Sequence, residues 1–125
     1  MIKFLKRIPI YIRIFEDQII VRRLDNGEGL GRTAELPFSN NRLLLADFDN
    51  LYELLNSTLI ELDKGIVNKY KFIFQLVTEN LNGVAQTEKM CLNDLGLKCG
   101  ANWVYIVEHA NELTDIELQR LLDKR

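Results

Sequence analysis

The stretch YIRIFEDQIIVRRLDNG, residues 11–27, predicts how the fold begins. Isoleucines recur at every second position over residues 8–15, and this period of two is typical of a half-buried strand. Residues 18–24 supply a second β-prone run, and the short polar tip Glu16-Asp17-Gln18 between the two runs favours antiparallel pairing. Asp25-Asn26-Gly27 then predicts a turn. The sequence therefore predicts an antiparallel hairpin near the N-terminus.

The clearest helix follows an irregular segment, residues 28–46, for which the pattern predicts no regular element. Asp47 is a suitable N-cap for this helix, and Gly65 is a suitable stop. Between them an apolar stripe recurs at helical spacing, and it comprises Phe48, Leu51, Tyr52, Leu55, Leu59 and Leu62. The near-continuous apolar run at 70–77 then predicts a buried central strand.

The last part of the chain predicts a helix, a strand and a second helix. The first helix covers about 85–99, and Gly96 in its middle predicts close backbone packing, because glycine weakens a helix interior. Residues 102–107 predict another buried strand. Thr114 and Glu117 have capping-box spacing at the start of the last helix. The order β-β-(irregular)-α-β-α-β-α contains βαβ units, which predict an α/β fold with a partly parallel sheet.

The composition indicates one ordinary globular domain over residues 1–125. Hydrophobic residues make up 47% and charged residues 27% of the chain, and a net charge of −2 gives no general attraction to nucleic acid. No apolar run reaches the length that a membrane-spanning helix needs. Cys91 and Cys99 would lie about two turns apart on one helix, where they cannot bridge each other, so free thiols are expected.

The chain contains few motifs of catalytic chemistry. It has no glycine-rich phosphate loop, no Cys-x-x-Cys, no His-Glu-x-x-His and no Gly-x-Ser-x-Gly, so neither a metal site nor a cofactor is expected. His109 is the only histidine and follows a predicted strand, where either an active-site residue or an ordinary polar residue could lie. A small enzyme that uses His109 with Glu108 is therefore one alternative, although no nucleophile or ligand set accompanies the pair.

Three segments together resemble the family of the bacterial actin-like rod-shape protein MreB. LGRT at 30–33, followed by LADF at 45–48 and a helix, is similar to the family's Leu-Gly-Arg-Thr and Ile-Ala-Asp-Phe. QTEK at 86–89 resembles its Gln-Val-Glu-Arg, and GANWVYIVE at 100–108 resembles its Gly-Ala-Arg-Glu-Val-Phe-Leu-Ile-Glu. The resemblance implies a single actin-like, ribonuclease-H-like subdomain, a mixed sheet with an N-terminal antiparallel hairpin and flanking helices.

The chain departs from this family where the family binds phosphate. Arg13-Ile14-Phe15 stands in place of the hairpin Asp-Leu-Gly-Thr, so the resemblance makes Arg13, Phe15, Glu16 and Asp17 a degenerate phosphate loop. The family's aspartate positions metal-bound water, and its glycine lets the backbone approach phosphate. The strand between the hairpin and Leu-Gly-Arg-Thr is expected to be largely missing. The family's second lobe, which closes on the nucleotide, has no counterpart in these 125 residues.

A second departure lies after the strand at 102–107. His109 stands where the family has the second glutamate of Ile-Glu-Glu-Pro, a residue associated with water activation, and Ala110 stands in place of the proline. Together with the degenerate hairpin, this departure implies a pseudo-ATPase that neither binds nor hydrolyses ATP. We therefore expect that the protein is not an enzyme and binds no cofactor.

The resemblance implies a function through protein–protein contacts. The first interpretation is a non-catalytic adaptor of the bacterial cell-shape cytoskeleton, which binds an actin-like filament or its partners. The alternative is a cytoplasmic adaptor subunit of a type IV pilus or type II secretion platform. In open α/β sheets, binding crevices form at the carboxyl ends of strands. The expected interface there comprises Asp17, Asn82, His109 and Ala110.

The first eight residues allow two interpretations. In a short amphipathic helix, apolar side chains such as Phe4 and Leu5 would share one side, and the cations Lys3, Lys6 and Arg7 would lie toward the other. Such a segment would contact an anionic membrane weakly and place a cytoplasmic protein at the inner face of the cell membrane. The second interpretation is a first strand with a basic start.

Overall fold

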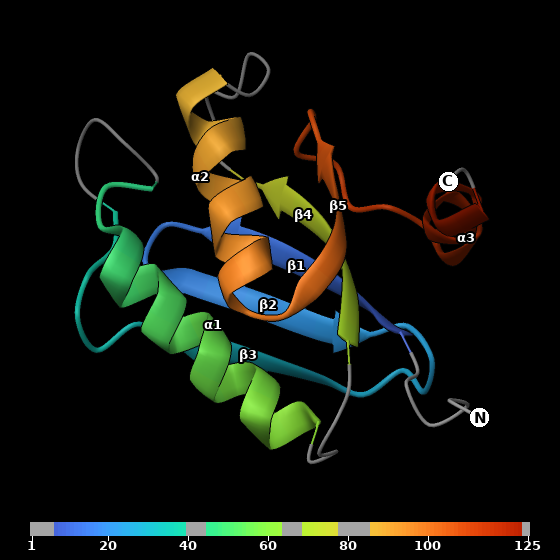
Figure 1. The fold of residues 1–125 in the computed structure, drawn as a ribbon, viewed down its shortest axis with the longest axis horizontal. Coiled ribbons are helices and arrows are strands. Elements are labelled where there is room, and N and C mark those ends of the chain that lie inside the picture. Colours follow the sequence, from blue (N-terminus) through green and yellow to red (C-terminus); the bar gives the residue numbers. More distant parts are fainter. Residues whose placement is uncertain (1–6, 40–44, 64–68, 78–85, 124–125) are drawn as a thin grey trace.

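The computed structural model describes residues 7–39, 45–63, 69–77 and 86–123. Within these ranges the chain forms a mixed five-stranded sheet with helices packed against it (Figure 1). The elements in chain order are β1 (Arg7–Phe15), β2 (Gln18–Arg23), β3 (Gly29–Thr33), α1 (Phe48–Leu62), β4 (Lys69–Leu76), α2 (Gln86–Lys98), β5 (Ala101–Val107) and α3 (Asp115–Asp123).

The sheet has the strand order β3-β2-β1-β4-β5. β1 pairs with β2, and β2 with β3, in antiparallel fashion, whereas β1, β4 and β5 run parallel to one another. The predicted N-terminal hairpin, the partly parallel sheet and the central position of the apolar run in β4 are confirmed. The α/β fold class is therefore the one that the sequence predicts.

The prediction for the segment after the hairpin is wrong. Residues 28–46 were expected to be irregular, but Gly29–Thr33 forms β3 and pairs with β2 in a register that sets Leu30 opposite Val21. Two of the five residues of β3 are glycines, which are depleted in strands and show no apolar alternation. For this reason the strand left no pattern in the sequence.

Each face of the sheet carries its own hydrophobic cluster. The alternate isoleucines of β1 lie on the face that α1 and α2 cover, where they pack with Leu51 and Leu55 of α1 and Phe72 and Phe74 of β4 (Figure 1). The opposite face holds a smaller cluster around α3, and it comprises Tyr11, Ile73, Val107, Leu113 and Leu118. Burying a side chain of this size contributes about 1.5–3 kcal/mol, so the larger cluster dominates the stability of the fold.

Local signals explain where the first two helices begin and how they pack. Asp47 caps α1 by accepting a hydrogen bond from the Asn50 backbone N–H at 3.0 Å, as predicted. Gly65, the predicted stop, lies outside the described residues, and α1 ends at Leu62. A Cβ atom added to Gly96 of α2 would lie 2.6 Å from Val104 Cγ2 on β5, which confirms the predicted close packing.

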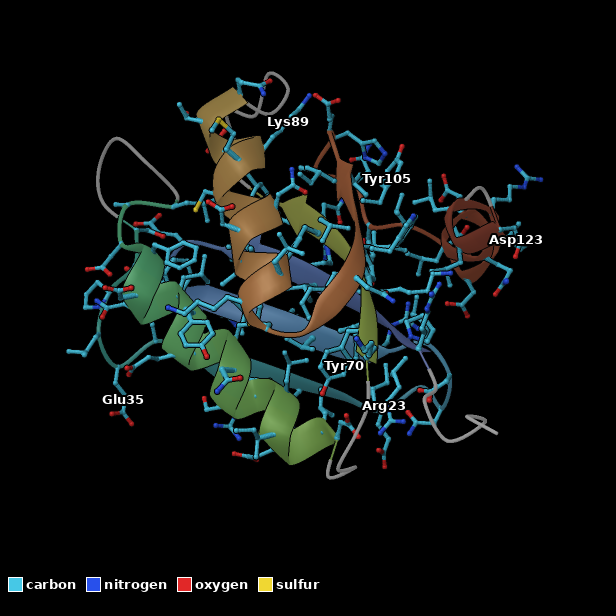
Figure 2. All side chains as sticks on the ribbon, viewed as in Figure 1. Arg23, Glu35, Tyr70, Lys89, Tyr105 and Asp123 are labelled. Carbon is cyan, nitrogen blue, oxygen red and sulfur yellow. The ribbon has the colours of Figure 1, made fainter. Side chains whose placement is uncertain are left out.

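The prediction that residues 102–107 form a buried strand is wrong in its burial. β5 is the last strand of the sheet, and only its ends, Ala101 and Val107, are buried. Tyr105 is 39% exposed and lies on the side of β5 that faces α3 (Figure 2). An edge strand has one neighbour instead of two, and the sequence pattern does not tell which apolar run lies at the edge.

The predicted cap of α3 is present. The Thr114 backbone N–H donates to Glu117 Oε1 at 2.9 Å, and the Glu117 N–H donates to Thr114 Oγ1 at 3.2 Å. The hydrogen bonds from Thr114 lower the pKa of the Glu117 carboxyl. Cys91 and Cys99 are free thiols, as expected, and burial raises the pKa of Cys99 to about 12.

The structure excludes Arg7 and Ile8 from the amphipathic helix that was one of the two interpretations of the N-terminus. Arg7 and Ile8 belong to β1, and Ile8 is buried opposite Tyr70 of β4, so neither residue can belong to an amphipathic helix. The other candidates for membrane contact, Lys3, Phe4, Leu5 and Lys6, lie outside the described residues. Among the described helices, none is long and apolar enough to cross a membrane.

Candidate functional site

The carboxyl ends of the three parallel strands lie at one edge of the sheet, which we call the carboxyl edge. It is formed by the last residues of β1, β4 and β5, by the tip between β1 and β2, and by the segment 108–113 after β5. Ligand-binding crevices of open α/β sheets form at such an edge. The structure brings Arg13, Phe15 and Ala110 to it, while Asn82 lies outside the described residues.

A fully buried glutamine is the centre of the carboxyl edge. Gln75 Oε1 accepts a hydrogen bond from Arg13 Nε at 3.0 Å and another from the Tyr11 hydroxyl. Its Nε2 donates to the backbone carbonyls of His109 at 2.8 Å and Asn111 at 2.7 Å. Both amide N–H groups and both lone pairs of the side chain are therefore paired within the chain.

Arg13 points back into the protein. Its Nη2 donates to the Ala110 carbonyl at 3.2 Å, its Nη1 lies 3.7 Å from Glu112 Oε1, and its guanidinium carbon is 5.2 Å from the centre of the Phe15 ring. The side chain is only 14% exposed. All three guanidinium nitrogens thus face partners from the chain itself.

Tyr11 closes the same network, which we call the Tyr11–Arg13–Gln75 network. Its hydroxyl donates to Gln75 and accepts the Leu113 backbone N–H at 3.1 Å. Burial raises the pKa of the Tyr11 hydroxyl, so the group stays a neutral donor over the physiological pH range. The network ties β1 and β4 to the segment that leads from β5 into α3.

Two members of this network, Gln75 and Tyr11, were not predicted from the sequence. Gln75 is the lone uncharged polar residue inside the apolar run of β4, and a buried polar side chain needs hydrogen-bond partners. This one residue was the only sign of the network in the sequence of β4. Tyr11 carried no signal, because it continues the strand pattern of its neighbours.

Asp17 has a structural role that the sequence did not predict. It occupies the left-handed region at φ 53°, and its Oδ1 accepts the backbone N–H groups of Phe38 at 2.9 Å and Ser39 at 2.7 Å. Its own N–H donates to Ser39 Oγ at 3.1 Å, and its carbonyl accepts the Ala34 N–H at 2.8 Å. Asp17 therefore fastens the segment after β3 to the hairpin tip, and its place in an interface stays a prediction.

Glu108 and His109 are both exposed at the end of β5. Glu108 pairs with Lys89 of α2 at 3.2 Å, and the described contacts include no side-chain hydrogen bond between Glu108 and His109. His109 contributes to a pocket of about 400 Å³ between β5 and α3, which Tyr105, Leu113 and Arg120 also line. In the described part of the chain, no three metal-ligating side chains come together.

Comparison with known proteins gives a fold but no sequence family. No family model matches the chain, and no curated protein sequence matches it. Among solved structures, MreB5 of Spiroplasma citri bound to AMPPNP is similar with a TM-score of 0.60 at 13% identity, over 82% of this chain and 39% of that one. The ADP-bound structure of the same protein gives 0.57 at 12% identity, over 82% of this chain and 38% of that one. The chain thus spans about two fifths of the structures that it matches, and it has an actin-like fold.

Proposed function

We propose that the chain is a non-catalytic, actin-like interaction protein of the bacterial cell-shape cytoskeleton. The observation that carries the proposal is the Tyr11–Arg13–Gln75 network at the carboxyl edge. A phosphate site needs convergent donors that remain free for the ligand and a backbone that can come close. Here the guanidinium nitrogens are paired within the chain, and Phe15 stands where a phosphate hairpin of this family has glycine.

The link to the cell-shape cytoskeleton has two supports. The fold is similar to that of MreB5, whose structures hold ADP or AMPPNP. The segments at 30–33, 86–89 and 100–108 resemble the motifs of the MreB family in order and spacing. Our proposal is that this chain shares the first subdomain of that family and has exchanged nucleotide binding for an internal polar network.

A calorimetric titration tests the non-catalytic part of the proposal. The purified chain is titrated with magnesium-ADP and magnesium-AMPPNP, the nucleotides held by the similar structures. We expect no binding heat up to millimolar nucleotide. Micromolar affinity for either nucleotide would contradict the loss of the phosphate site.

The partner is tested in the native host. A photo-crosslinking amino acid placed at His109, which is exposed beside the carboxyl edge, should capture an actin-like filament protein. The same amino acid at exposed Asn93 of α2 is the matched control for nonspecific capture. Capture of a pilus or secretion component would favour the alternative platform, and equal products at both positions would place the interface elsewhere.

A further inference from the structure

Among the described strands β3 is the outermost of the sheet, and no described strand pairs with the outer side of its backbone. The hydrogen bonds from Arg23 N to the Glu28 carbonyl and from Ala34 N to the Asp17 carbonyl set the alternation of the β2–β3 ladder. By this alternation Leu30 and Arg32 bond to β2, whereas the N–H and C=O groups of Gly29, Gly31 and Thr33 point out of the sheet. Within the described residues, no backbone partner satisfies these outward groups.

In the described residues, β3 contains no proline and no bulge, and its one charged side chain, Arg32, is paired with Glu61 of α1. Native sheets cover or blunt their edges with charged side chains, prolines or bulges. β3 has a regular register with β2, and its outward residues include two glycines, which place no side chain in the way of an approaching backbone. On the face away from α1, Ile20 lies opposite Gly31 and is 38% exposed.

A groove runs beside this edge on the other face. Its volume is about 310 Å³, and it lies between residues 32–36 and the first half of α1, with Leu36 and Leu54 as its large apolar lining. Its carboxylates are Glu35 and Glu53, both exposed, and Glu35 projects outward beside α1 (Figure 2). The one cation of the lining, Arg32, is already paired with Glu61 of α1. The groove is therefore acidic, with two large apolar side chains in its lining.

We propose that the β3 edge binds an extended, basic segment of a partner protein as a sixth strand. The backbone of the segment would hydrogen-bond to Gly29, Gly31 and Thr33, as in strand addition to a sheet edge. Alternate side chains would enter the groove, where apolar groups meet Leu36 and Leu54 and lysine or arginine meets the two carboxylates. The inference rests on the proposed function, because it supplies the surface and the partner chemistry of an interaction protein.

The charge of the groove argues against a second copy as the occupant. Symmetric pairing of two β3 strands would bring two α1 helices close together, since α1 packs beside β3. The acidic groove of one copy, with the exposed carboxylates Glu35 and Glu53, would then lie near the acidic groove of the other. Like charges at close range oppose such a dimer, whereas a basic segment neutralises them.

A selection experiment with matched variants tests the proposal. Random peptides of about ten residues are displayed on phage and selected on the purified chain, and the affinity of the enriched peptides is measured by fluorescence anisotropy. We expect enriched sequences in which lysine or arginine alternates with apolar residues. Gly31→Pro removes an outward N–H that the sheet does not use, and it should weaken binding about tenfold or more.

The control variant is Gly31→Ala, which keeps the N–H. Its added Cβ would lie 3.8 Å from Ile20 Cγ1, an ordinary contact, so the affinity should stay within about threefold of wild type. Reversing Glu53 to lysine should weaken binding, while reversing exposed Asp94 of α2 should not. N-methylation of the peptide amides that pair with β3 tests the same hydrogen bonds without changing the protein.

Three results would overturn the edge site: acidic enriched peptides, equal binding by wild type and Gly31→Pro, or dimerisation of the free chain that Gly31→Pro abolishes. None of these results changes what the nucleotide titration says about the proposed function. A chain that bound AMPPNP but lost its peptide with Gly31→Pro would refute the proposed function and keep the edge site. Undiminished crosslinking to a filament protein by Gly31→Pro would keep the function and refute this edge as its surface.

Discussion

The carboxyl edge and the β3 edge satisfy their polar groups in opposite ways. At the carboxyl edge the side chains of Tyr11, Arg13 and Gln75 are paired with one another and with backbone carbonyls. At the β3 edge, backbone groups of Gly29 and Gly31 have no such partners within the described residues. Both edges belong to one small sheet, so the difference lies in the side chains that each edge carries.

This difference indicates which edge holds the fold together and which can accept a partner. A buried polar network costs stability when one member is removed, because the remaining members lose their partners. An outward backbone group in water has no such cost, because water replaces the partner. Substitutions within the Tyr11–Arg13–Gln75 network should therefore change stability, and substitutions at the β3 edge should change binding.

The largest effect is expected from Gln75→Leu. The apolar side chain has a similar size but leaves Arg13 Nε, the Tyr11 hydroxyl and two backbone carbonyls without their shared partner. We expect a loss of roughly 3 kcal/mol or more in the free energy of unfolding, measured by urea denaturation. The melting temperature should fall on the order of 10 °C.

The matched control for this substitution is Gln119→Leu. Gln119 is an exposed glutamine of α3 whose Nε2 donates to Asp123 Oδ1 at 3.0 Å. Its replacement should change the free energy of unfolding by less than about 0.5 kcal/mol. Equal losses for the two variants would mean that the buried network contributes nothing particular to the fold.

The next effect is expected at the hairpin tip. Asp17→Ala removes the acceptor of the Phe38 and Ser39 N–H groups and puts alanine at φ 53°, so we expect a loss of about 2 kcal/mol. Asp17→Asn keeps an acceptor oxygen and tolerates this backbone region, and it should lose less. Exposed Glu16→Ala is the control. Thermal melting of the three variants should rank them in that order, and an unchanged melting temperature for Asp17→Ala would show that its carboxylate does not stabilise the fold.

A smaller effect is expected in alkaline solution. Burial raises the pKa of Tyr11 above its unfolded value of about 10. The neutral hydroxyl therefore contributes stability in full below about pH 10, and this contribution is lost as the pH rises through the higher pKa of the folded state. Tyr11→Phe cannot titrate, so its unfolding free energy should fall less steeply between about pH 9 and 11 than that of the wild type.

Tyr70, near the start of β4, is the control for the alkaline effect. Burial and the hydrogen bond to Asp63 raise the pKa of Tyr70 as well, so Tyr70 contributes to the same decline. Tyr70→Phe should leave the share of Tyr11 in place, and the double variant should be the flattest. Identical slopes for wild type and Tyr11→Phe would show that the Tyr11 hydroxyl does not hold its proton more tightly in the folded state.

How much of this could be predicted from the sequence depends on where the partner of each residue lies. The caps formed by Asp47 and Thr114 join residues three positions apart, and their spacing alone predicted them. The role of Gly96 was predicted because glycine is costly inside a helix. In these cases the signal is a residue type at a fixed position in a local element.

The contacts that the sequence did not predict are made to backbone groups, which no residue type identifies. Gln75 bonds to carbonyls of His109 and Asn111, and Asp17 bonds to N–H groups of Phe38 and Ser39. Every residue type supplies such backbone groups, so no motif marks them. The sequence pattern did not show the order of the strands in the sheet either. For this reason β5 was predicted to be buried, and β3 was not predicted at all. The structure brings Arg13, Phe15 and Ala110 of the predicted site together, but the sequence did not predict the network that joins them.

The smallest effect on stability is expected from Gly31→Pro, and its neighbours make the test sharp. The ladder alternation directs the N–H of Gly31 away from β2, so proline removes no hydrogen bond of the sheet, and the melting temperature should fall by no more than a few degrees. At Leu30 and Arg32 the same substitution deletes an N–H that bonds to β2, and we expect losses of about 3 kcal/mol at each. Proline should thus be tolerated at 31 and disruptive at 30 and 32, a period of two along β3 that thermal melting can measure. If all three prolines are equally disruptive, the outward N–H of Gly31 has a partner in solution, and the β3 edge is already closed. If the period of two is found, the edge is open, and the loss of peptide binding by Gly31→Pro can be assigned to the missing hydrogen bond rather than to a damaged fold.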